Sequence, residues 1–264
     1  MLLARYFRER YAELGGVIVG VDTYAGGATD FSSQIAKILA LPAPPDMLYV
    51  SSGPDDIGRI IKQLRAAGLA QPIVGGDGYD TPLLLQVAGA AADNTYFTTH
   101  AFLDPQRGNA GPAPVHRGLH DRVRRSPDTA FAALGYDAVM LIANAIERAG
   151  SAKQKAIPEA LEATDDFPAV TGSISFGPGE HIPDKDVTVV KIVGTTPTLA
   201  AVIRPQKVPA PEGVPARTAG GREGRGGRRR DCCEPLDLSL PPARGGGCGR
   251  RGATIHSGSA RARR

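Results

Sequence analysis

One stretch of sequence decides the fold, PDMLYVSSGPDDIGRIIKQLRAAGLAQPIVGGDGYD (Pro45–Asp80). It contains two apolar runs of strand length, Asp46–Val50 and Gln71–Gly75. Between them, apolar residues recur at helical spacing from Asp55 to Ala67, and a glycine ends the helix. A strand, a helix and a second strand joined by short turns predict a parallel pair of strands with a helical crossover.

The same alternation continues on both sides of this unit. The further elements predicted in the first hundred residues are a helix over residues 3–14 ended by Gly15-Gly16, a strand at Val17–Val21, a helix over Phe31–Leu39 capped by Thr29 or Asp30, a helix over Pro82–Ala88 and a strand at Thr95–Thr98. This order predicts an α/β protein with a parallel, doubly wound sheet and helices on both faces.

The second half of the chain has a different pattern. Residues 104–114 are rich in glycine and proline, which is typical of a connection between lobes. The elements predicted after it are a long helix ending at Ala149-Gly150, a helix over Ile157–Ala163, and strands at Val170–Phe176, Val187–Val193 and Leu199–Ile203.

Composition divides the chain into a body and a tail. The whole chain is 42% hydrophobic and 22% charged with a net charge of +4, an ordinary globular balance. Residues 204–264 hold 14 basic and 5 acidic residues, a net charge of +9, and lack aromatic residues. Residues 1–203 hold 17 basic and 22 acidic residues, a net charge of −5. We expect a folded, mildly acidic body followed by a disordered tail.

The tail admits two explanations. Clustered arginines would suit a nucleic-acid-binding segment, but this stretch has no aromatic residue for base stacking. Translation of a GC-rich gene in a shifted frame also yields arginine, glycine and proline without a pattern, and we favour this explanation. Cys232 and Cys233 are adjacent and cannot chelate a metal as a CxxC pair does, so we expect an unpaired thiol pair.

Motifs for catalysis, cofactors and metals are missing from the sequence. It contains no phosphate-binding GxxxxGK[ST] and no GxSxG, and Gly75–Gly78 lacks the spacing of a dinucleotide site. His116 and His120 share a helical spacing without a third ligand, which favours solvent-facing histidines. We therefore predict no enzyme activity, no cofactor and no metal. The sequence contains no apolar run of the roughly 18 residues that a membrane-spanning helix needs. A signal peptide cannot be recognised in it either.

Candidate ligand contacts follow the predicted strands, because ligands of parallel sheets bind beyond the carboxyl ends of the strands. These loops are Asp22–Ala28, Ser51–Pro54, Gly75–Asp80 and Thr99–Leu103. Asp77 lies between two glycines, where its carboxylate could bind an ammonium group. From the residues alone, a turn in which Asp77 bonds its own loop is favoured over a ligand contact.

Five blocks of sequence resemble the branched-chain amino-acid (Leu/Ile/Val) family of ABC-transporter substrate-binding proteins, which have the type I periplasmic binding protein fold. The blocks are TDFSSQIAKI (Thr29–Ile38), PDMLYVSSGPDDIGRIIKQLRAAGL (Pro45–Leu69), PIVGGDGYD (Pro72–Asp80), AALGYDAVMLIANAIERAGS (Ala132–Ser151) and VTGSISFGPGE (Val170–Glu180). The resemblance implies two lobes that close on a ligand. It makes residues 1–103 most of the second lobe, 104–114 a connection, 115–185 part of the first lobe, 186–203 the final crossing and 204–264 a segment without a counterpart.

The resemblance also implies roles for residues and partners. It places Asp77 against the α-ammonium group of an amino acid or amide, with Gly76 beside it. The neighbouring cleft loop is formed by Ser51, Ser52 and Gly53, and Phe131 lies near the pocket for the ligand's side chain. A membrane permease and an ATPase would be the partners of an intact relative, and its location would be periplasmic.

The chain departs from the family in ways that indicate a fragment. A family member would begin with a signal peptide, half of the first lobe and the first strand of the second lobe, none of which is found here. We therefore expect an exposed apolar face on the helices of residues 115–185 and, without a signal peptide, a cytoplasmic location for the chain as written. The alternative functions are a cytoplasmic amide- or amino-acid-sensing regulator on the same fold and nucleic-acid binding through the tail.

Overall fold

The computed structural model describes residues 2–103, 129–177, 179 and 181–206, all within one compact unit, Met1–Arg217. The predicted connection at 104–114, the pair His116 and His120, and the tail beyond residue 206 lie outside the described residues. The proposed division of the chain into two lobes stays a prediction.

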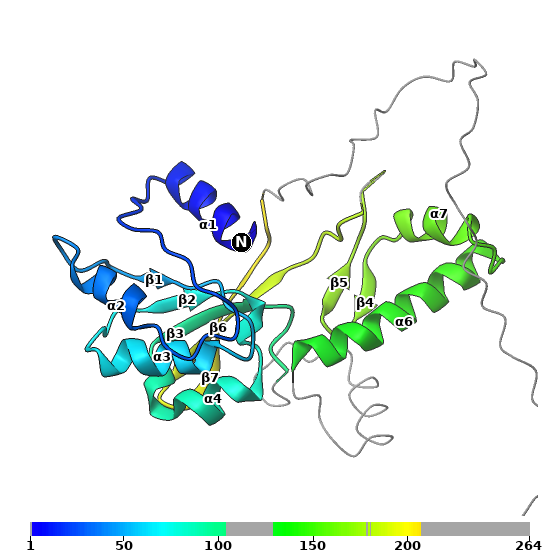
Figure 1. Ribbon diagram of the computed structural model, residues 1–264. Helices are drawn as coiled ribbons and strands as arrows, with labels where there is room; N and C mark the ends of the chain where they lie inside the picture. Colours follow the sequence, from blue (N-terminus) through cyan, green and yellow to red (C-terminus); the bar gives the residue numbers. More distant parts are fainter. Residues whose placement is uncertain (1, 104–128, 178, 180, 207–264) are drawn as a thin grey trace, which may run out of the picture. The chain divides into compact units, whose positions relative to one another are not determined.

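The elements alternate as the sequence predicted (Figure 1). In chain order they are α1 (Leu2–Glu13), α2 (Ser32–Leu39), β1 (Leu48–Tyr49), α3 (Ile57–Ala66), β2 (Ile73–Gly75), the 3-10 helix η1 (Asp77–Tyr79), α4 (Pro82–Ala88), the 3-10 helix η2 (Gly89–Ala92), β3 (Thr95–Thr99), α6 (Ala130–Ala149), α7 (Ala156–Glu162), β4 (Phe167–Ala169), β5 (Gly172–Ile174), β6 (Val187–Val193) and β7 (Thr196–Ile203).

A five-stranded sheet has the order β1-β2-β3-β6-β7 (Figure 1). The pairs β1–β2 and β2–β3 are parallel, whereas β6 runs antiparallel to both β3 and β7. The predicted α/β class is confirmed, with two antiparallel strands added at one edge of the parallel part.

The two faces of the sheet are covered by different helices. Leu48, Ile73 and Thr95 are paired across the strands, so their side chains share one face, and all three are buried. The apolar core on this face also contains residues of α3 and α4, among them Ile57, Ile61, Leu64 and Leu84. Tyr49 points to the other face, where its ring stacks on Phe7 of α1 with 3.7 Å between ring centroids.

Local signals in the sequence explain where the helices begin and end. The Thr81 hydroxyl accepts a hydrogen bond from the Leu83 amide at the start of α4, and Pro82 occupies the first turn, where its missing amide hydrogen costs nothing. Beyond the carboxyl ends of α3 and α6, Gly68 and Gly150 adopt φ values of +84° and +59°, a conformation that favours glycine.

The strand predicted at Val17–Val21 does not form. The segment lies outside any helix or strand, and Val17, Val19 and Val21 are more than half exposed. In a doubly wound sheet with the strand order 2-1-3-4-5, the strand that is second in the chain lies at the edge and pairs only with the first strand. Val17–Val21 corresponds to this second strand. Among the described residues, those before Val17 form a helix and a turn rather than a strand, so the segment has no ladder partner.

The single strand predicted at Val170–Phe176 is also wrong. The chain forms a short antiparallel hairpin of β4 and β5 instead, with Ala169 paired to Gly172 next to the turn. Gly172 has a φ of +107°, which reverses the chain inside what the apolar pattern predicted as one strand.

A buried carboxylate joins this hairpin to α6. The side chain of Asp137 is only 2% exposed. Its Oδ1 accepts a hydrogen bond from the Val170 amide at 2.8 Å, and its Oδ2 accepts from the amide and the hydroxyl of Thr171 at 2.9 and 2.7 Å. Since a buried charge is costly unless it is hydrogen-bonded, these three donors hold the turn against the helix.

The helix α6 leaves much of its apolar surface uncovered. Phe131, Val139, Met140 and Ile142 are all more than 40% exposed, which confirms the exposed face expected for these helices. With 20 residues, and a mean hydropathy of 1.3 over an 18-residue window, α6 is also long and apolar enough to cross a membrane, contrary to the sequence prediction. One such helix is weak support for a membrane span, because helices of soluble proteins pass the same test.

We predict that Asp137→Asn lowers the free energy of unfolding by about 3 kcal/mol, because an amide cannot accept all three hydrogen bonds. Urea denaturation of the full chain, followed by circular dichroism, measures the change. The exposed substitution Glu159→Gln on α7 serves as the control and should change the value by less than about 0.5 kcal/mol. Equal midpoints for the two variants would contradict the anchoring role of Asp137.

Candidate functional site

The candidate site lies where β1, β2 and β3 end. Parallel pairing brings the carboxyl ends of these strands to one edge of the sheet. The loop after β1 holds Ser51–Gly53, and η1 follows β2. The two loops touch, because a Cβ on Gly78 would lie 2.2 Å from the carbonyl oxygen of Ser52. Only glycine permits this approach.

The buried ring of Tyr79 fixes the position of η1. Its hydroxyl donates a hydrogen bond to the Val50 carbonyl at 2.7 Å, which joins η1 to the end of β1. The ring lies directly against Gly75, where any side chain would collide with it. Burial raises the pKa of the Tyr79 hydroxyl well above its usual value, so the group stays a donor.

Asp77 is the exposed carboxylate of this edge. Its side chain is 47% exposed, and its Oδ2 lies 3.5 Å from Nε2 of His100, the residue that follows β3. No hydrogen bond within its own loop is made by the Asp77 side chain among the described residues, unlike the turn that the residues alone favoured. The carboxylate is available to a cationic group.

Asp80, three residues further on, has a structural role. Its Oδ2 accepts hydrogen bonds from the Thr99 hydroxyl at 2.6 Å and from the Ala130 amide at 3.0 Å. The first bond holds the end of β3, and the second holds the start of α6. Both segments therefore meet at the loop that carries Asp77.

The hydrogen bond from the Ala130 amide to Asp80 also brings the next residue, Phe131, to the site. Its ring packs edge-on against His100, with 5.7 Å between ring centroids, and 46% of the residue is exposed. The main-chain carbonyl of His100 accepts a hydrogen bond from Lys185 Nζ at 3.4 Å. Burial lowers the pKa of Lys185, and the nearby carboxylates of Asp137 and Asp186 oppose that shift.

Tyr49 lies close enough to Asp77 for its hydroxyl to be affected by the charge of that carboxylate. Burial, and to a lesser degree the negative charge of Asp77, raise the pKa of the Tyr49 hydroxyl to about 12. Its ring stacks on Phe7 of α1. The same helix covers Gly76, since Leu3 fills the place where a Cβ would be.

The predicted site residues thus fall into two groups. Asp77, Ser51, Ser52 and Gly53 gather at one edge of the sheet, and Phe131 joins them through His100. Gly76 is buried under α1, so its backbone is covered by protein. Whether any of these residues contacts a ligand stays a prediction.

Sequence reasoning missed three residues of this region, His100, Tyr49 and Asp80. The first could have been found, because it lies in Thr99–Leu103, a loop already expected at the site. The roles of Tyr49 and Asp80 depend on contacts with residues 42 and 50 positions away, Phe7 and Ala130. No local pattern indicates such contacts.

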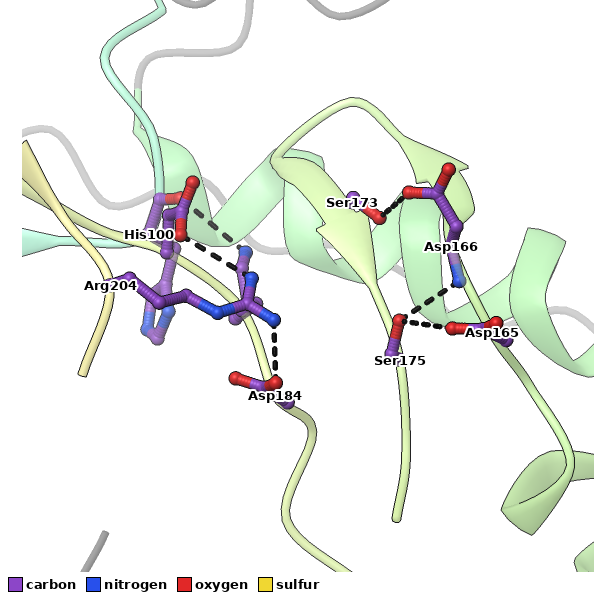
Figure 2. A network of polar contacts seen from close by, with 9 residues as sticks. His100, Asp165, Asp166, Ser173, Ser175, Asp184 and Arg204 are labelled. Carbon is purple, nitrogen blue, oxygen red and sulfur yellow. Dashed lines mark hydrogen bonds and ion pairs between the residues drawn. The ribbon is translucent and has the colours of Figure 1, made fainter. Parts of the chain in front are cut away.

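Two further features of the described structure do not include Asp77 itself. A pocket of about 520 Å³ is bordered by α4, β3, β6 and β7 and has a largely apolar lining, including Leu84, Phe97, Phe102 and Ile192. Figure 2 shows the ion pair of Arg204 with Asp184. It also shows that Ser173 is hydrogen-bonded to Asp166, and Ser175 to both Asp165 and Asp166. Within the described part of the chain, no group of three or more histidine, cysteine or acidic residues is placed to hold a metal ion.

Residues 2–196 match the family described as periplasmic binding protein. The chain belongs to this family. The family is one of substrate-binding proteins, and the resemblance found in the sequence blocks is confirmed.

Relatives of known sequence bind branched-chain amino acids by name. The leucine-, isoleucine-, valine-, threonine- and alanine-binding protein of Pseudomonas aeruginosa is 26% identical over 185 residues, which are 69% of this chain and 47% of the relative. A Leu/Ile/Val-binding protein homolog of Brucella suis is 28% identical over 66% of this chain and 45% of its own. The chain thus spans about half the length of these relatives.

Solved structures agree with this assignment. The leucine-binding protein LivK of Thermotoga maritima is 31% identical with a TM-score of 0.66, over 76% of this chain and 56% of that protein. The substrate-binding protein LivJ of Streptococcus pneumoniae, solved in complex with isoleucine, is 31% identical with a TM-score of 0.65 over the same shares.

The contact between the two cleft loops gives a prediction for Gly78. Gly78→Ala should lower the free energy of unfolding by about 1–3 kcal/mol, because its Cβ would collide with the Ser52 carbonyl. The matched control is Gly53→Ala in the neighbouring loop, where nothing lies within 4 Å of the added Cβ. Urea denaturation compares the two variants. A loss as large in Gly53→Ala would show that the effect is not steric.

A second prediction concerns alkaline pH. Because the folded protein holds the Tyr49 proton up to about pH 12 and the unfolded chain loses it near 10, stability should fall as the pH rises from about 10 to 12. Tyr49→Phe should show a smaller fall in the urea midpoint over this range. An unchanged fall in the variant would exclude Tyr49 as a source.

Proposed function

We propose that this chain is a substrate-binding component, or part of one, of an ABC transporter for branched-chain or related amino acids. The observation that carries the proposal is the half-exposed carboxylate of Asp77 at the carboxyl edge of a parallel sheet. It belongs to a chain whose relatives are named for binding leucine, isoleucine and valine.

The geometry suits an amino-acid ligand in two respects. Asp77 offers negative charge to an α-ammonium group, and a charge-assisted hydrogen bond to a carboxylate is about twice as strong as a neutral one. The apolar ring of Phe131 lies on the far side of His100 and would face the ligand's side chain. Ser51, Ser52 and Gly53 would border the ligand from the loop after β1.

The proposed mechanism is binding without chemistry. In this family's two-lobed proteins the cleft would close on the ligand and present it to a membrane permease driven by an ATPase. The location of such a component would be the periplasm or another extracytoplasmic space.

Equilibrium dialysis with radiolabelled leucine, isoleucine and valine tests the ligand class. Two proteins are measured, the full chain and a chimaera joining it to the part of the Pseudomonas aeruginosa relative that it does not match. We expect binding of at least one of the three amino acids, and at least tenfold weaker binding in Asp77→Asn. N-acetyl-leucine, which has no ammonium group, should not compete.

The control is Asp46→Asn, which removes an exposed carboxylate before β1, at the end of the strand opposite the site. It should leave the affinity within twofold. If neither protein binds any of the three amino acids, the proposed ligand class is wrong. If binding survives Asp77→Asn unchanged, the assigned role of Asp77 is wrong.

A further inference from the structure

The imidazole of His100 lies beside the proposed ammonium site. Its Nε2 lies 3.5 Å from Asp77 Oδ2, and 36% of its side chain is exposed. Its ring also contacts Phe131. It therefore lies between the two side chains proposed for the ligand's ammonium group and its apolar part.

The position of the His100 ring is fixed by the surrounding structure. The preceding residue, Thr99, is paired with Thr188 in the sheet and bonded through its hydroxyl to Asp80. The His100 carbonyl accepts from Lys185, whose Nζ also donates to Thr171 at 2.7 Å. With its main chain held on both sides and its ring against Phe131, His100 faces Asp77.

We propose that His100 makes ligand binding depend on pH, because it competes with the ligand's ammonium group for Asp77. This inference rests on the proposed function. When the imidazole is neutral, Nε2 can donate a hydrogen bond to one carboxylate oxygen and leave the other oxygen to the ligand. When the ring is protonated, its positive charge occupies the carboxylate and repels the incoming ammonium group.

The sign of the pH dependence follows from the charges around the ring. Protonation of the imidazole adds a positive charge 3.5 Å from the Asp77 carboxylate, and histidine is the side chain that ordinarily gains charge on mild acidification. Among the described residues nearby, Tyr49 is neutral with a pKa of about 12, and the ammonium group of Lys185 contacts the carbonyl rather than the ring. The carboxylate of Asp80 is bonded to Thr99 and Ala130. Ligand affinity should therefore fall as the pH is lowered.

Leucine binding at pH 8.0 and pH 5.5 tests the proposal, on whichever of the two proteins binds leucine. We expect affinity to fall about tenfold on acidification, and His100→Gln to reduce that fall to less than twofold. A fall that persists in His100→Gln, or no fall in the unaltered protein, overturns the role of His100 while the proposed function stands. If leucine does not bind, the same measurement is made with isoleucine and valine, and absence of binding of all three at both pH values overturns the proposed function and this role with it.

A ligand-free measurement tests the pairing separately. The chain has five histidines. In the NMR spectrum of the full chain, the ring signals of His100 are identified as the one set that vanishes in His100→Gln. At pH 5.5, Asp77→Asn should shift these signals, whereas the matched Asp46→Asn, at an exposed position before β1, should not. Unchanged signals in Asp77→Asn would show that the ring does not pair with Asp77, which overturns the proposal.

Discussion

Parallel pairing of β1, β2 and β3 is the constraint on which the rest of the structure depends. It forces the three strands to end at one edge, so that residues far apart in sequence become neighbours there. The register of β2 and β3 pairs Gly75 with Phe97 and thereby sets Asp77 beside His100. A slip by one residue would turn every side chain of β3 to the opposite face and separate these two groups.

Buried or half-buried carboxylates extend this arrangement to the second half of the chain. Asp80 accepts from the first amide of α6, and Asp137, inside α6, accepts from the turn of the β4–β5 hairpin. Lys185 then connects that turn with the His100 carbonyl. The helix and hairpin are therefore joined to the edge of the sheet by polar contacts between segments distant in sequence, while the exposed side chains of α6 contribute little.

The sequence predicted the alternation of helices and strands well, because each element of Pro45–Asp80 has its own apolar period and its own glycine or proline boundary. It failed at Val17–Val21, since β-branched residues favour a strand but cannot supply its partner, and at Gly172, whose φ reverses the chain. For the site, glycines marked Asp77 as a candidate. The approach of His100 depends on strand register, which no local pattern records.

Asp77 and Asp80 are three residues apart and have different roles. The carboxylate of Asp80 is bonded to the Thr99 hydroxyl and the Ala130 amide, whereas among the described residues that of Asp77 makes no hydrogen bond within its own loop. Backbone packing at Gly78 and the Tyr79 ring hold the loop regardless of what residue 77 is. Evolution can therefore exchange the side chain at position 77 at little cost to folding, and this edge of the sheet can acquire a new ligand preference while the scaffold beneath it is inherited unchanged.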